Sequence, residues 1–230
     1  MSSQNIFTVQ SICQTISDLR GETTPNTNAV RIRAISNAEQ DFARRKFWRI
    51  HRVYAQSLGS GDGTTTDFTI GTATYPYRAK GLFELFSGGT TEDKRFQVVD
   101  EGRYTFLFNQ DNSIKIAYEF YDASTDLWKV RMNPAPSTGD AITAGYYYMP
   151  PTRTLTTDSM PCYNNQIIAR AALADIYHAD DELAKEQQQQ QITEQLIGEA
   201  VGIENTPAIG QQYVFGAIEN QNMRRGIGTY

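Results

Sequence analysis

The stretch "CYNNQIIARAALADIYHADDELAKEQQQQQITEQLIGEAV", residues 162–201, decides the fold of this 230-residue chain. Its apolar residues recur at the spacing of an amphipathic helix. They are Ile168, Ala172, Ile176, Leu183, Ile192, Leu196 and Ala200. Such a helix cannot bury its stripe alone, so it needs helical partners from elsewhere in the chain. A break is expected near 178–181, where Asp180 or Asp181 can cap a second segment.

Five successive glutamines, Gln187 to Gln191, interrupt this stripe. Glutamine is a good helix former, and no Gly, Ser or Pro accompanies the run, so the helix should continue through it. The glutamine segment then either overhangs into water or meets another protein or a wet channel. The apolar residues that follow are expected to lie beyond the domain's own core: Ile192, Leu196, Ile197 and Val201. A neighbouring subunit should cover them. The residues predicted for this inter-subunit helix surface are Gln187, Gln188, Gln191, Ile192 and Leu196.

The partner helices are predicted near the N-terminus. Residues 7–21 carry apolar positions at helical spacing and end at Gly21, a natural C-cap. A second helix should run from about Ala29 to Arg49, capped by Thr27 or Asn28. The C-terminal helix should begin near Cys162, capped by Asp158 or Ser159. The two cysteines, Cys13 and Cys162, are expected to be buried free thiols.

Between these helices the hydrophobic period changes to two. Residues 51–150 contain about eight short segments of strand character, separated by Gly, Asp, Asn and Pro. "RYTFLFN" (103–109) and "SIKIAYEF" (113–120) are predicted to pair as a hairpin. The pattern indicates an antiparallel β-sandwich or barrel-like sheet. The fold class is therefore α+β: an antiparallel helical unit (1–50 and 151–201), an inserted β domain (51–150) and an extended C-terminal arm (202–230).

Composition excludes several classes of protein. The net charge is −5 and charged residues make up 20%, which does not indicate a nucleic-acid surface driven by bulk charge. No apolar run is long enough to span a membrane. His51 and His178 are the only histidines, so the sequence offers too few ligands for a structural zinc site. The Gly-rich loop 59–67 lacks a phosphate-binding Lys and leads into a strand, so a hairpin loop is expected. Neither a catalytic motif nor a cofactor is predicted.

One basic segment stands out, "ARRKFWR" (43–49), in which aromatics alternate with cations. Three interpretations stay open: a helix end whose cations favour its dipole, a basic lining that faces passing DNA, and an inter-subunit salt bridge. Phe47 is expected on the buried stripe, with Trp48 about a quarter-turn away on the helix. The candidate DNA-channel or inter-subunit residues are Arg44, Arg45, Lys46 and Arg49.

The last residues, 202–230, show no sustained period and are rich in Gly, Asn and Gln. They carry the aromatic motif "YVF" and a terminal tyrosine, so they should gain order on another surface. The predicted contact residues of this arm are Tyr213, Val214, Phe215, Arg224, Arg225 and Tyr230.

The order of these segments resembles the head-to-tail adaptor (connector, neck) proteins of tailed bacteriophages. The similarity rests on "NAVRIRAISNAEQDFARRKFWRIHRV" (28–53), a β insertion, residues 163–200 and a ragged tail. It implies a non-enzymatic virion protein, made in the bacterial cytoplasm, that forms a ring beneath the portal, commonly of twelve copies. The ring would continue the DNA channel, contact the portal and the tail or nozzle proteins, and touch passing double-stranded DNA non-specifically. The arm would reach the portal or a neighbouring subunit.

Two alternatives from other classes remain. One is a different virion β protein, from the tail or decorating the capsid, in which the sheet is the adhesive part. The other is a carbohydrate-binding or hydrolytic module that uses the aromatic run Tyr146, Tyr147 and Tyr148 beside acid pairs such as Glu119 with Asp122. Residues alternate sides along a strand, so at most two rings of that run can share a face.

Overall fold

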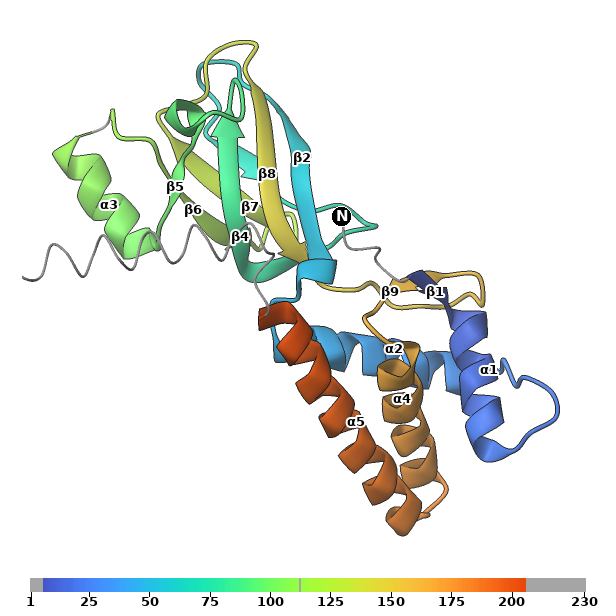
Figure 1. Ribbon diagram of the computed structural model, residues 1–230. Coiled ribbons are helices and arrows are strands. Elements are labelled where there is room, and N and C mark those ends of the chain that lie inside the picture. The colour runs from blue at the N-terminus through green and yellow to red at the C-terminus, as the bar shows by residue number, and fades with distance from the viewer. Residues whose placement is uncertain (1–5, 112, 206–230) are drawn as a thin grey trace, which may run out of the picture.

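The computed structural model describes residues 6–111 and 113–205 and has a mixed α+β fold. Most helices gather at one end of the molecule and most strands at the other (Figure 1). The helical end consists of α1 (Val9–Arg20), α2 (Ala29–Arg45), α4 (Asn165–Ala179) and α5 (Leu183–Asn205). Side chains from all four helices meet in one apolar core. The prediction that helices from the two ends of the chain are partners is therefore confirmed.

Local sequence explains where most of these helices begin and end. Asn28 caps α2 by accepting a hydrogen bond from the backbone N–H of Arg31 at 2.8 Å. Gly21 ends α1 in the left-handed conformation, with φ of 70°. The predicted cap of α4 was wrong, because Asn164 takes that role by accepting from the N–H of Gln166. Residues just before it form β9 (Ser159–Pro161), which pairs antiparallel with β1 (Ile6–Thr8). Neither of these short strands was predicted.

The glutamine run lies inside α5, which is continuous from Leu183 to Asn205 as predicted. The expected break also occurs: Asp181 adopts φ of 57°, and the chain turns between α4 and α5. The three glutamines predicted for an inter-subunit surface are not covered by the described part of the chain, and that role stays a prediction. Gln187, Gln188 and Gln191 are exposed, whereas Gln189 is half-buried and accepts a hydrogen bond from Arg170 at 2.8 Å. Because the helix is broken between α4 and α5, the residues of α5 that face the core are not those expected from an unbroken helix.

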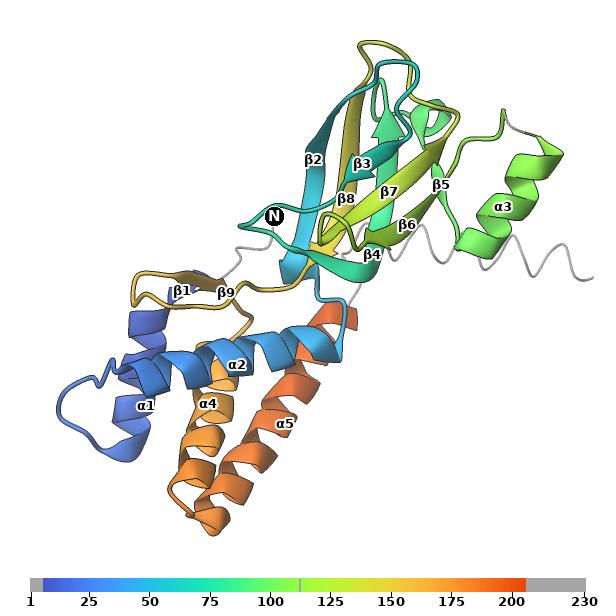
Figure 2. The same cartoon turned by 180° about the vertical axis from the view of Figure 1, so that it is seen from behind.

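The apolar end of α5 does not project beyond the chain's own core, contrary to the prediction. Ile197 and Ala200 are buried in the helical core, and Leu196 and Val201 pack against it. The turn at 180–182 folds α5 back along α4, which brings these residues onto the core (Figure 2). Their burial removes the need for a neighbouring subunit at this position.

Two sheets form the other end of the molecule. One has the order β2–β8–β4, from Arg52–Ser60, Ala141–Tyr148 and Tyr77–Ser87. The other has the order β3–β7–β6–β5, from Asp67–Thr69, Leu127–Asn133, Ile116–Asp122 and Gln97–Val98. Both sheets contribute to one apolar core. Neither closes on itself, so the described residues contain no barrel, and β5 pairs with β6 in parallel rather than antiparallel.

The predicted hairpin of residues 103–120 is wrong in its first half. Residues 101–110 form helix α3 (Glu101–Gln110), which projects from the strand end of the molecule (Figure 1). Asp100 caps it by accepting from the N–H of Arg103 at 2.9 Å. Tyr104 and Leu107, three positions apart, face the sheet, whereas Phe106 is 60% exposed. The alternating aromatics suggested a strand, but the cap and the three-residue spacing gave the helix.

The segment after α2 joins the two ends of the molecule. The helix stops at Arg45, so Phe47 and Trp48 do not take the helical positions that were predicted for them. Trp48, not Phe47, is the buried ring: Trp48 is fully buried and Phe47 is partly exposed. The Trp48 ring stacks on Phe42 at 4.4 Å, and its Nε1 donates to the Phe42 carbonyl at 2.7 Å. Arg78, on β4, donates to the carbonyls of Arg44 at 2.9 Å and Lys46 at 2.8 Å, and so caps α2 from the sheet.

A buried ion pair fixes the returning chain to α2. Glu39 is 1% exposed and receives two hydrogen bonds from Arg153, each of 2.7 Å. Burial raises the pKa of Glu39 even though Arg153 opposes this shift. The backbone N–H of Arg153 also donates to Ser36 at 3.0 Å. The link after β8 is thereby held on the middle of α2.

Replacing Arg153 with Met should destabilise the protein by about 3–5 kcal/mol at neutral pH, because Glu39 would be left buried and unpaired. The loss should shrink as the pH falls, since a protonated Glu39 has no charge to desolvate. Chemical denaturation across pH measures both effects. The matched control is Arg44→Met, which breaks the exposed pair with Asp41 and should cost less than about 1 kcal/mol. Equal losses in the two variants would contradict the account.

His51 lies at the same junction, buried between the rings of Phe42 and Tyr148. Both of its ring nitrogens lack a hydrogen-bond partner within the described structure. Burial, together with the nearby charges of Arg78 and Arg153, lowers its pKa from 6.5 to about 3. The folded protein therefore keeps a neutral imidazole where the unfolded chain would take up a proton.

The stabilising effect of a neutral His51 should be fully present above pH 6.5 and should fall as the pH drops from 6.5 towards 3. One proton bounds the slope at about 1.4 kcal/mol per pH unit. In His51→Phe this contribution should vanish, so the difference between the two stability-against-pH curves isolates it. Parallel curves would show that His51 is charged or solvated in the folded protein.

Candidate assembly surfaces

The C-terminal end of α5 is fastened to the end of α2 by a set of polar contacts, here called the root cluster: Lys46, Arg49, Tyr163, Glu204 and Asn205. The Glu204 side chain is 4% exposed and receives hydrogen bonds from the Arg49 backbone N–H at 2.6 Å and guanidinium Nε at 2.9 Å. Lys46 donates to Asn205 at 2.8 Å. The Tyr163 hydroxyl also donates to Glu204, and burial together with this carboxylate raises the pKa of Tyr163.

The root cluster determines where the arm leaves the folded body. Arg49 also donates from Nη2 to the Ile203 carbonyl at 3.1 Å, so a cation lies at the helix C-terminus where the dipole favours it. The last described residue, Asn205, is therefore held at a defined place near the junction of the two ends of the molecule. No sequence signal connected Tyr163 or Glu204 with Arg49, because they are far apart in the chain.

The basic residues of 43–49 are drawn into the chain's own contacts. Arg45 pairs with Glu194 at 2.6 Å, and Arg44 pairs with Asp41 at 2.9 Å. Lys46 and Arg49 belong to the root cluster. Three of the four cations thus join the end of α2, or the segment just after it, to α5 within one subunit. Their role as a DNA-channel lining or inter-subunit surface stays a prediction, and the contacts give them a simpler structural role.

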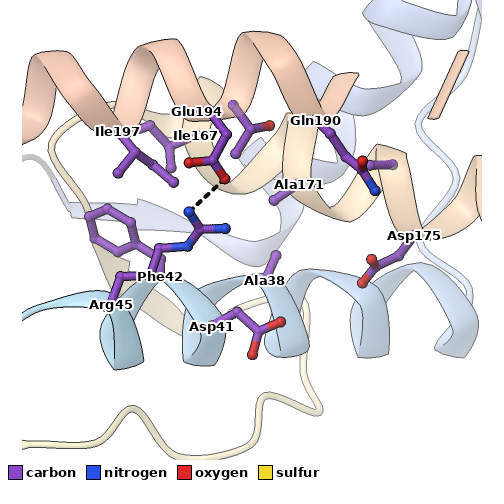
Figure 3. Close-up of a pocket in the computed structure, with 12 residues that line it drawn as sticks. Ala38, Asp41, Phe42, Arg45, Ile167, Ala171, Asp175, Gln190, Glu194 and Ile197 are labelled. Atoms are coloured by element: carbon purple, nitrogen blue, oxygen red, sulfur yellow. Dashed lines mark hydrogen bonds and ion pairs between the residues drawn. The ribbon is translucent and has the colours of Figure 1, made fainter. Parts of the chain in front are cut away.

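A groove of about 380 Å³ runs between α2 on one side and α4 and α5 on the other (Figure 3). We call it the helical groove. Its floor is apolar and includes three small residues, Ala38, Ala171 and Ala174, which leave it open. The other floor residues are Phe42, Ile167 and Ile197, and its polar lining is Asp41, Arg45, Asp175, Gln190, Thr193 and Glu194. Sequence reasoning did not find this groove, since it needs the packing of three helices.

The charge of the helical groove is unbalanced. Glu194 is paired with Arg45, and Asp41 is paired with Arg44 outside the groove. Among residues 6–111 and 113–205, no cation forms an ion pair with Asp175. Burial and the neighbouring carboxylate of Asp41 raise the pKa of Asp175. A cation supplied from outside would relieve this repulsion.

The residues considered for carbohydrate binding or hydrolysis make structural contacts instead. Tyr146 and Tyr148 are buried, and Tyr147 packs between Phe47 and Phe83, so the tyrosine run offers no sugar platform. Glu119 bonds to the Tyr77 hydroxyl, and Asp122 pairs with Lys129 at 2.6 Å.

The searched part of the chain gives two further findings. Within residues 6–111 and 113–205, no group of three or more His, Cys, Asp or Glu side chains is arranged to hold a metal. Each helix there is too short or too polar to cross a membrane. Both cysteines are free and buried, as expected.

The predicted contact residues of the arm lie outside the described residues: Tyr213, Val214, Phe215, Arg224, Arg225 and Tyr230. Their role stays a prediction. The predicted surface on α5 is exposed at Gln187, Gln188 and Gln191, while Ile192 and Leu196 are half-buried against the chain itself.

Replacing Glu204 with Ala should cost about 1.5–3 kcal/mol, because a buried carboxylate bonded to Arg49 and Tyr163 is lost. Amide hydrogen exchange should accelerate most at the end of α5, since the root cluster holds it. The matched control is Glu194→Ala on the same helix; the Glu194 side chain is 59% exposed, and its loss should cost less than about 1 kcal/mol. Unchanged exchange at residues 197–205 in Glu204→Ala would refute the anchoring role.

Comparison with known proteins identifies the class of this chain. A family model described as SU10 adaptor protein matches residues 7–212, which includes every described helix and strand from α1 onwards. Among proteins with curated functions, no match was found. The family match indicates a structural rather than enzymatic role in the virion, in contact with portal or tail proteins. The chain belongs to the SU10 adaptor protein family and is a phage head–tail adaptor.

Proposed function

We propose that this protein forms a ring of identical subunits in the phage neck, between the portal and the tail, and that the ring continues the DNA channel. We further propose that the arm, residues 206–230, makes contacts outside its own subunit. The folded body would act as a rigid block, and the arm would link that block to the portal and to neighbouring copies. Residues 202–205, which were first assigned to the arm, belong to α5.

One observation supports this proposal: the described helices and strands bury two large apolar cores among themselves. The helical core takes in both ends of the described chain, including Ile197 and Ala200 near the end of α5. Twenty-five further residues follow Asn205, and they include Tyr213, Val214 and Phe215. A segment with aromatic residues that follows such a core is suited to bind another surface.

The root cluster supports the same proposal mechanically. An arm that starts from a fixed point searches a smaller volume than one that starts from a frayed helix, so less entropy is lost when it binds. In a closed ring every subunit presents the same surface to the next, so one arm site repeated around the ring satisfies all copies. The anchoring of Glu204 by Arg49 thus serves assembly as well as folding.

A chain that ends at Asn205 should unfold at nearly the same denaturant concentration as the full chain, because the core and the root cluster are retained. It should fail to form a stable complex with the portal protein of the same phage. Sedimentation of each protein mixed with that portal measures the outcome.

A second variant tests the same proposal in the full-length chain. Tyr213→Ala/Phe215→Ala removes two aromatic rings from the arm without shortening it. It should bind the portal at least about tenfold more weakly than the original protein, which corresponds to about 1.4 kcal/mol. If both variants assemble on the portal as well as the original protein does, the arm has no role in assembly.

A further inference from the structure

The helical groove has two properties that together specify its occupant. Its floor is apolar and kept open by Ala38, Ala171 and Ala174, so it can take side chains of moderate size. Its lining carries three carboxylates, from Asp41, Asp175 and Glu194, against the single cation Arg45, which already pairs with Glu194. An occupant that fits must therefore bring positive charge and apolar side chains on one short segment.

The chain itself contains such a segment at its end. Within 206–230 the only cations are the adjacent Arg224 and Arg225, and Met223 and Ile227 flank them. The remaining charged side chain of the arm is Glu219, outside this stretch. Arginine pairs with carboxylates through a planar fork of donors, and Asp175 has no such partner among the described residues.

The length of the arm allows this segment to reach a groove on another copy. From Glu194, in the groove, to Asn205 the helix rises by about 16 Å. The seventeen residues 206–222 can extend to about 55 Å, well beyond that distance. The chain after Asn205 is therefore longer than the path to the groove of its own subunit requires, which leaves length for the same groove on an adjacent copy.

We propose that the helical groove of each subunit receives residues 223–230 of a neighbouring copy, with Arg224 or Arg225 pairing with Asp175 and Met223 or Ile227 against the apolar floor. This inference rests on the proposed ring and names the place on the next subunit where the arm ends. Each subunit would give one arm and receive one, which is the head-to-tail contact that closes a ring. The aromatic motif Tyr213–Phe215 remains available for the portal.

The first test is a cross-link in the full-length chain. Asp175→Cys combined with Arg225→Cys, mixed with the portal protein and oxidised, should give covalent multimers on a non-reducing gel, because the two thiols would meet between copies. Gln195→Cys with Arg225→Cys is the matched control; Gln195 is exposed on α5 and lines neither the groove nor the predicted inter-subunit surface, so no multimers should form. Each single variant controls for the native Cys13 and Cys162, which are buried.

Three results of the cross-link test overturn the inference. A cross-link confined to single chains would show that the arm folds back on its own groove. A ring detected by sedimentation without any cross-link would place the arm elsewhere and leave the proposed function intact. If the original protein forms no ring on the portal, the proposed function fails, and the inference fails with it.

Charge exchange supplies a second test that a folding defect would not mimic. Asp175→Lys should weaken ring formation about tenfold, since it places a lysine opposite the arginines. Adding Arg224→Glu and Arg225→Glu to the Asp175→Lys variant should restore ring formation. Ala171→Leu should also weaken assembly by filling the groove without a change of charge. If the exchanged variant assembles no better than Asp175→Lys, the arginines do not pair with this groove.

Discussion

The fold depends on the burial of α2 by helices from both ends of the chain. Its apolar face carries Ile32, Ile35 and Phe42, which share one core with side chains of α1, α4 and α5. None of these helices can bury its stripe alone, so the helical core forms only when the N-terminal and C-terminal parts come together. The inserted strands lie between those parts in the sequence but outside that core in space (Figure 1).

The two ends of the molecule are joined by contacts that are mostly buried. Trp48 stacks on Phe42 where α2 ends, Arg78 reaches from β4 to the last carbonyls of α2, and Arg153 binds Glu39 in its middle. These contacts leave little freedom for the sheets to move relative to the helices. A rigid subunit of this kind would suit the proposed ring, which must keep its shape while a tail is attached.

Sequence patterns predicted the large features because those depend on local periodicity. The caps at Gly21 and Asn28, the break near Asp181 and the continuous helix through the glutamines are all consequences of neighbouring residues. The class of protein followed from the order of these segments, and the family match confirms it. The domain boundaries and the role of the arm stay predictions.

The failures have two physical causes: local signals that were weighted wrongly, and contacts between residues distant in sequence. The helix α3 was predicted as a strand because alternating aromatics were given more weight than the Asp100 cap. The end of α5 was placed outside the core because the turn at 180–182 resets the helical phase. The root cluster and the helical groove join residues separated by more than a hundred positions, such as Arg49 and Glu204, which no local pattern connects.

The central claim is that the folded body is complete without the arm, and that the arm makes its stabilising contacts with another molecule. A cryo-electron microscopy reconstruction of the neck in intact virions tests this most directly, because it shows the course of the chain after Asn205. The account predicts density that leaves the subunit at the root cluster and continues on the portal and in the helical groove of an adjacent copy. Density for residues 206–230 that stays folded over its own subunit, touching no other chain, would contradict it.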